Sequence, residues 1–142
     1  MKKVLFVAFM ALAFVGMTSC QKDEDLSGTK WVFTETDTDT DEYDGVTYTY
    51  EYTLTVSLEF NSETAGVMNM VMSGKVNGVP TGSETDKTDY TYTYDGNGNG
   101  TITIIDEDTG KPETTNFTIV DNKLTISETE DGETYTMVFI KQ

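Results

Sequence analysis

The sequence predicts an all-β fold: an up-and-down antiparallel meander of about eight strands that closes into a β-barrel, with a β-sandwich as the alternative. Three observations support this prediction. Apolar and aromatic residues alternate with polar residues through most of the chain after residue 30. Short turn sequences rich in glycine, asparagine and aspartate separate the alternating segments. The chain after residue 20 shows no amphipathic helical pattern.

The first two expected strands cover residues 30–38, with Trp31 and Phe33, and residues 45–60. The second strand has the clearest pattern, because its even positions are apolar or aromatic and its odd positions are threonine, serine or glutamate. The apolar set consists of Tyr48, Tyr50, Tyr52, Leu54, Val56, Leu58 and Phe60. A period of two over this length predicts a long, half-buried strand.

The third expected strand covers residues 65–77 and follows a turn centred on Glu63. That turn would pair the methionines of the third strand with the second strand, Met68 facing Leu58, Met70 facing Val56 and Met72 facing Leu54. The segment 79–87 contains Pro80, Gly82 and Ser83 and is expected to be the longest mobile loop. The acidic run 37–45 is likewise expected to be a solvated loop between strands.

The remaining strands are expected at residues 87–95, 100–106, 113–120, 123–129 and 133–140. Tight turns fix their register. The Asp121-Asn122 turn sets Ile119 opposite Leu124 and Phe117 opposite Ile126, and the Asp131-Gly132 turn sets Leu124 opposite Phe139 and Ile126 opposite Met137. Tyr90, Tyr92 and Tyr94 precede the turn 95–100, and Ile102 and Ile104 follow it with matching parity.

The N-terminus has the features of a secretory signal. Lys2 and Lys3 precede an apolar run, residues 4–15, that is too short for a transmembrane helix. The sequence Met17-Thr18-Ser19-Cys20 resembles the lipobox of bacterial lipoproteins, which implies lipid attachment to Cys20 and cleavage before it. We therefore expect a signal peptide at 1–19, a lipidated cysteine with an acidic tether at 20–28, and the barrel at 29–142.

The residues after Cys20 bear on the cellular location of the protein. Residues 21–25, Gln-Lys-Asp-Glu-Asp, resemble the export signal that sends lipoproteins of Bacteroidetes to the outer face of the outer membrane. The alternative interpretation is an acidic linker that lifts the domain off the bilayer. The expected location is the cell envelope, with the lipid anchored in the outer membrane and the domain exposed at the surface.

Composition excludes several functions. Cleavage removes two of the nine lysines and leaves seven against 25 acidic residues, a net charge of −18 (7 − 25). Nucleic acid is therefore not an expected partner. The chain has no histidine and no arginine, and its one cysteine is assigned to the lipid, so histidine-based nucleophilic catalysis and imidazole-ligated zinc are excluded. We expect no enzymatic activity and no cofactor, and a protein partner is not identified.

The chain also resembles the lipocalin-like lipoproteins of Bacteroidetes. The resemblance rests on Leu26, Gly28 and Trp31, with Trp31 one position beyond the commonest spacing, and on the closing segments 122–126 and 135–141. It implies a barrel of about eight antiparallel strands with a ligand cavity. The chain lacks the arginine that lipocalins carry near the C-terminus.

Aromatic residues are the candidate ligand-binding groups. If they point into one barrel, they form a mouth for a small apolar or aromatic ligand. The candidate set is Trp31, Tyr48, Tyr50, Tyr52, Met70, Tyr90, Tyr92 and Tyr94. The alternative is that these side chains fill the core. The protein would then be a surface interaction or structural lipoprotein with a solid core, whose acidic loops bind calcium or a partner.

One segment matches a calcium-loop pattern. Asp95, Asn97 and Asn99 have the required spacing, and Asp106 lies at the twelfth position. Residues 101–105 would have to leave the β-ladder for Asp106 to reach the same ion. The alternative is a tight hairpin turn, for which Asp-Gly and Asn-Gly are typical sequences.

Overall fold

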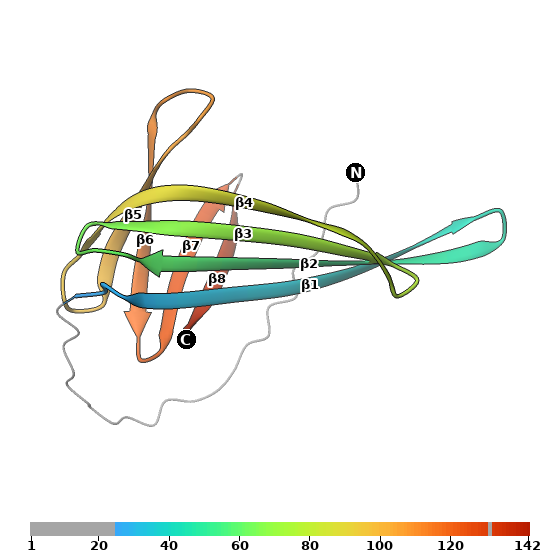
Figure 1. The fold of residues 1–142 in the computed structure, drawn as a ribbon, viewed down its shortest axis with the longest axis horizontal. Helices are drawn as coiled ribbons and strands as arrows, with labels where there is room; N and C mark the ends of the chain where they lie inside the picture. Colours follow the sequence, from blue (N-terminus) through green and yellow to red (C-terminus); the bar gives the residue numbers. More distant parts are fainter. Residues whose placement is uncertain (1–24, 131) are drawn as a thin grey trace.

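The computed structural model describes residues 25–130 and 132–142 and shows eight antiparallel strands that form one closed barrel (Figure 1). The strands are β1 (Thr29–Tyr43), β2 (Val46–Phe60), β3 (Ala65–Val76), β4 (Val79–Tyr94), β5 (Asn99–Ile105), β6 (Pro112–Val120), β7 (Lys123–Glu130) and β8 (Glu133–Lys141). Each strand pairs with its neighbours in sequence, and β1 also pairs with β8. The predicted all-β meander and its closure into a barrel are confirmed, and the sandwich alternative is excluded.

The register predicted from the turns is also confirmed. Met68, Met70 and Met72 pair with Leu58, Val56 and Leu54, while Ile119 pairs with Leu124 and Phe117 with Ile126. Leu124 pairs with Phe139, and Ile126 with Met137. These pairs place the apolar residues of neighbouring strands on one side of the sheet, which is the side that forms the core.

The strands differ greatly in length, and this difference shapes the molecule. β1 to β4 have 12 to 16 residues each, whereas β5 to β8 have seven to nine. β1 pairs with β8 only at Trp31 and Val32, and β4 pairs with β5 only from Thr91 onward. The long strands therefore run past the closed barrel as an open sheet, which we call the extension (β1 33–43, β2 46–56, β3 70–76 and β4 79–86; Figure 1).

The core fills the closed part of the barrel and reaches the start of the extension at Val56. Its residues are Leu26, Trp31, Val56, Leu58, Phe60, Tyr90, Tyr92, Ile102, Phe117, Leu124, Ile126 and Phe139. Leu26, which the sequence analysis places in the tether, is only 1% exposed. The Gly28 amide donates to the Phe60 carbonyl at 2.6 Å, so the segment before β1 packs onto the end of β2. The folded domain thus includes residues ahead of position 29.

Two segments expected to be loops are strands. Residues 79–87 belong to β4 and pair with β3 across a register shift between Gly74 and Lys75, and residues 37–43 belong to β1 and pair with β2. Both predictions were wrong because these polar sequences have little strand preference of their own. Backbone hydrogen bonds to the partner strand hold them in the sheet instead. The turn between β1 and β2 consists of Asp44 and Gly45, with φ values of 56° and 76°.

Within the described part of the chain, no helix is long and apolar enough to span a membrane. The expected signal peptide, Cys20 and most of the acidic tether lie outside the described residues.

Candidate functional site

The candidate site is the side of the extension that continues the barrel interior, which we call the inner face. Strand residues alternate between the two sides of a sheet, so the register assigns each side chain to one of them. The even residues of β2 and β3, the odd residues of β1, and Glu84 and Asp86 of β4 share the side of the buried Val56. Their chemistry divides into an apolar centre on β2 and β3 and acidic margins on β1 and β4.

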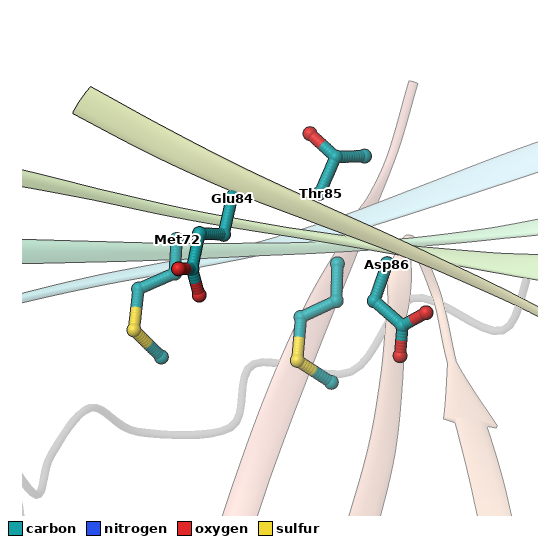
Figure 2. Close-up of a pocket in the computed structure, with 5 residues that line it drawn as sticks. Met72, Glu84, Thr85 and Asp86 are labelled. Atoms are coloured by element: carbon teal, nitrogen blue, oxygen red, sulfur yellow. The ribbon is translucent and has the colours of Figure 1, made fainter.

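One hollow of about 470 Å³ lies at the β3–β4 margin of the inner face. Met70 and Met72 form its apolar part, and Glu84, Thr85 and Asp86 line the other side. Figure 2 shows the side chains of Met72, Glu84 and Asp86 on the same side of the strands, while Thr85 points to the opposite side. Met72 is 48% exposed, so its apolar surface is accessible beside the carboxylates.

A second hollow of about 420 Å³ lies at the β1–β2 margin. Tyr50 and Tyr52 provide its aromatic side, and Asp39 and Asp41 provide carboxylates from the paired strand. Tyr52 is 50% exposed. The two hollows therefore repeat one combination of groups, an apolar or aromatic pair beside two acidic side chains.

Positive charge is kept off the inner face. Lys30, Lys75 and Lys87 have the opposite parity on β1, β3 and β4, and so lie on the outer side of the sheet. There, Lys30 pairs with Glu59 at 2.8 Å and Lys75 pairs with Glu51 at 2.5 Å. The acidic margins of the inner face thus receive no charge compensation from the lysines of their own strands.

The pKa of Glu35 is raised in this acidic surrounding. This residue lies on the inner face of β1, where partial burial and, secondly, the nearby Asp37 raise the pKa of its carboxyl above the usual value. Both causes penalise the charged form, and a cation close to Glu35 would offset them by stabilising the carboxylate.

Three of the predicted ligand-binding residues, Trp31, Tyr90 and Tyr92, belong to the core and are buried. The Tyr90 hydroxyl donates to the Glu59 carbonyl at 3.1 Å, and the Tyr92 hydroxyl donates to the Ser62 carbonyl at 2.6 Å. Burial raises the pKa of both phenols. Their rings pack edge-on against Phe60, so these tyrosines fill the barrel and their hydroxyls are already hydrogen-bonded.

The other candidates are distributed differently. Tyr94 is half-buried and stacks on Phe117 with ring centroids 6.3 Å apart. Tyr48, Tyr50 and Tyr52 lie on the extension, and Tyr52 precedes the core residue Phe60 by eight residues, about 27 Å of strand. The structure therefore does not bring the two tyrosine sets into one mouth, because β2 is far longer than the closed barrel is tall.

The calcium-loop pattern is also broken up, because Asp95, Asn97 and Asn99 share one turn while Asp106 lies far from them. Asp95 and Asp106 lie at opposite ends of β5, about 20 Å apart, because residues 99–105 remain in the ladder. The Asp95 carboxylate accepts hydrogen bonds from the amides of Asn97 and Asn99 and from the Asn99 side chain, and these bonds lower its pKa. The segment is a hairpin turn, and among the described residues no group of three or more acidic, histidine or cysteine side chains is arranged for a metal.

The inner-face residues that sequence reasoning missed are Met72, Glu84, Asp86, Asp39 and Asp41. Four of them lie in the segments that were predicted to be loops, where the even or odd spacing of the acids was the signal of a strand.

Comparison of the chain with protein-family models, with curated proteins and with solved structures gives no significant match. The resemblance to lipocalin-like lipoproteins therefore stays a prediction.

Proposed function

We propose that this protein is an envelope-anchored, lipocalin-like lipoprotein that acts as a noncatalytic binding module for a small apolar or aromatic ligand, held on the inner face of the extension. The observation that carries this proposal is the β3–β4 hollow, where Met70 and the half-exposed Met72 present apolar surface on the side that continues the barrel interior. Its volume lies within the range typical of small-molecule sites.

The binding proposal is tested with a neutral fluorescent probe, N-phenyl-1-naphthylamine, added to the mature chain carrying Cys20→Ser so that it is not acylated. We expect probe fluorescence to rise on binding and Met72→Thr to weaken the affinity several-fold, because the variant removes apolar contact area. Val71→Thr is the matched control, since the neighbouring side chain lies on the outer side of β3. Equal affinity in both variants would contradict the proposed site.

A natural ligand can be sought directly. The protein is purified gently from its own envelope, and its native mass is compared with that of the same sample stripped by organic solvent. A reproducible excess mass that stripping removes supports the binding module and begins to identify its cargo.

The anchoring part of the proposal rests on residues 2–20, where a charged and apolar signal leads to the lipobox-like sequence before Cys20. Lipid on this residue would hold the domain at the outer membrane, since several acyl chains anchor stably. Cys20→Ala should release the full-length product from the membrane fraction and abolish labelling by a palmitate analogue, whereas Ser27→Ala should do neither. Membrane retention of a Cys20→Ala chain that has lost its signal would refute the anchor.

A second candidate function is a surface interaction or structural lipoprotein. The observation that favours it is the filled barrel core, in which Trp31, Phe60, Phe117 and Phe139 are all fully buried. A bare native mass before and after stripping, together with no binding of the naphthylamine probe, would favour this candidate over the binding module.

A further inference from the structure

The β3–β4 hollow combines apolar and acidic groups in a regular order. Met70 pairs with Asp86 and Met72 pairs with Glu84, so each methionine lies directly across from a carboxylate. The two acidic residues are two positions apart on one strand, about 7 Å, and project from the same side (Figure 2). A ligand that lies on the methionines therefore has both carboxylates along its edge.

The two carboxylates have free bonding capacity. Among the described residues, Glu84 makes no hydrogen bond or ion pair, and Asp86 uses one oxygen to accept from the Lys87 amide at 2.8 Å. The lysines of β1, β3 and β4 lie on the other side of the sheet, as shown above. The charge of this margin is thus available to a ligand.

The opposite margin has the same sign. Glu35 pairs with Leu54, Leu54 pairs with Met72, and Met72 pairs with Glu84, so one line across the sheet has a carboxylate at each end and an apolar centre. The ends are three strand spacings apart, about 14 Å. An anionic ligand would meet repulsion from both margins, and a neutral one would leave both unused.

A bare metal ion does not suit the hollow. The described residues include no cluster of three or more acidic, histidine or cysteine side chains that could hold a metal, and the methionines would be poor partners for a hard cation. An organic cation fits better, because its amino group needs only one or two carboxylates and its apolar part suits the polarizable methionine side chains.

We infer that the ligand of the inner face is a cationic amphiphile, a small organic amine whose ammonium group lies between Glu84 and Asp86 while its apolar chain or ring lies on Met70 and Met72. This inference rests on the proposed binding function and adds the charge of the ligand to it. The positive group supplies the selectivity, and the apolar body supplies contact area that a neutral or anionic analogue would share.

The test compares three probes with one apolar chain, decylammonium, decanol and decanoate, by calorimetry at submillimolar concentration with the mature chain carrying Cys20→Ser. We expect decylammonium to bind about tenfold more tightly than decanol, because its ammonium group forms exposed charge pairs with the two carboxylates. Decanoate should bind most weakly because both carboxylates repel it. Raising the salt concentration to about 0.5 M should remove most of the difference between decylammonium and decanol.

The double variant Glu84→Gln/Asp86→Asn should bring decylammonium to within about twofold of decanol, with the decanol affinity of the same variant measured as the reference. The control Glu107→Gln/Asp108→Asn removes the same two charges from the exposed turn between β5 and β6, and should keep the preference for the amine. Circular dichroism checks that both variants are folded.

The outcomes separate the two proposals. Decanoate binding as tightly as decylammonium, or an equal loss of preference in the test and control variants, would overturn the inference and leave an apolar site. Failure of all three probes to bind, or decanol binding that Met72→Thr does not weaken, would overturn the proposed binding function itself.

Discussion

The ring of Tyr90 lies across its cross-strand partner Gly66. A Cβ built on Gly66 overlaps the ring carbon Cζ and the hydroxyl of Tyr90 and the Glu59 carbonyl oxygen. The glycine lets the tyrosine reach over β3, and its hydroxyl donates to Glu59 on β2. Gly100 and Phe117 on β5 and β6 repeat this relationship, so two aromatic core residues depend on a glycine directly opposite.

Gly66→Ala should therefore destabilise the barrel by about 2 to 3 kcal/mol, because the added methyl group has no space and the ring must leave its position. Urea unfolding followed by tyrosine and tryptophan fluorescence measures the change. Gly74→Ala is a control on the same strand, also opposite a tyrosine. There the nearest atom is the side-chain oxygen of Thr81, which can rotate away, and we expect a smaller loss. Equal losses would contradict the role of the ring.

The buried phenol of Tyr90 predicts a loss of stability in alkaline solution. Burial raises the pKa of Tyr90 above its usual value near 10, so the folded state holds a proton that the unfolded chain releases at lower pH. The contribution is complete below about pH 10 and is lost as the pH rises from there toward the folded-state pKa. The slope reaches up to about 1.4 kcal/mol per pH unit for one tyrosine.

Tyr90→Phe should flatten this part of the profile. Unfolding free energies at about pH 8 and about pH 11 test the prediction, and Tyr92 should leave a residual slope because burial also raises its pKa. Identical slopes in the wild type and in Tyr90→Phe would show that other groups cause the alkaline loss.

Leu26 should behave as a core residue although it precedes the first strand. Its side chain is buried, and its carbonyl accepts hydrogen bonds from the amide and hydroxyl of Thr29 at 3.1 and 2.6 Å. Leu26→Ala should lower the free energy of unfolding by about 3 kcal/mol through lost burial and the cavity left behind. Val138→Ala, at an exposed position of β8, should change it by less than about 0.5 kcal/mol. Equal small effects would place Leu26 in a tether.

The free edge of β1 is blocked by its own aspartates. Beyond Val32 this strand pairs only with β2. Asp37, Asp39 and Asp41 each accept a hydrogen bond from the amide of the following residue, at 2.8 to 2.9 Å. On the edge of β4, Asp86 does the same for the Lys87 amide. Occupied amide groups and negative charge both oppose pairing with another strand.

Replacing Asp37, Asp39 and Asp41 together with alanine should promote self-association, because the change exposes three edge amides and removes three charges. Analytical ultracentrifugation measures the oligomeric state. The matched asparagine variant loses the same charges but keeps an acceptor oxygen at each position, and it should remain largely monomeric. If both variants associate to the same extent, charge repulsion alone protects the edge.

Much of the fold could be predicted because local sequence encodes it. Alternation along β2 and the short connections from β6 to β7 and from β7 to β8 fix which residues face each other. A slip by one residue would turn every apolar side chain outward. The polar runs 37–43 and 79–87 could not be identified in the same way. Residues 37–41 and 83–86 alternate acids with threonine or serine, and Pro80 and Gly82 resemble turn residues, so neither run gives an apolar signal although the strands are real.

The candidate site was predicted only in part. The tyrosines and Met70 were chosen for their chemistry, but the sequence does not give the height at which the barrel closes. That height decides that Tyr90 and Tyr92 are core residues while Tyr50 and Tyr52 line an open hollow. Likewise, Asp95 and Asp106 match a spacing, and only the ladder of β5 separates them.

The sequence by itself determined the strand-and-turn order, the parity of each strand, the acidity of the chain and the absence of histidine chemistry, because these depend on residue type and on neighbours close in the chain. Tertiary structure alone decided that β1 meets β8 at two residues, that Leu26 packs into the core, and that Met72 lies beside Glu84. These relationships depend on strands of unequal length. The backbone pairing of the sheet decides which residues of those strands lie at the same level.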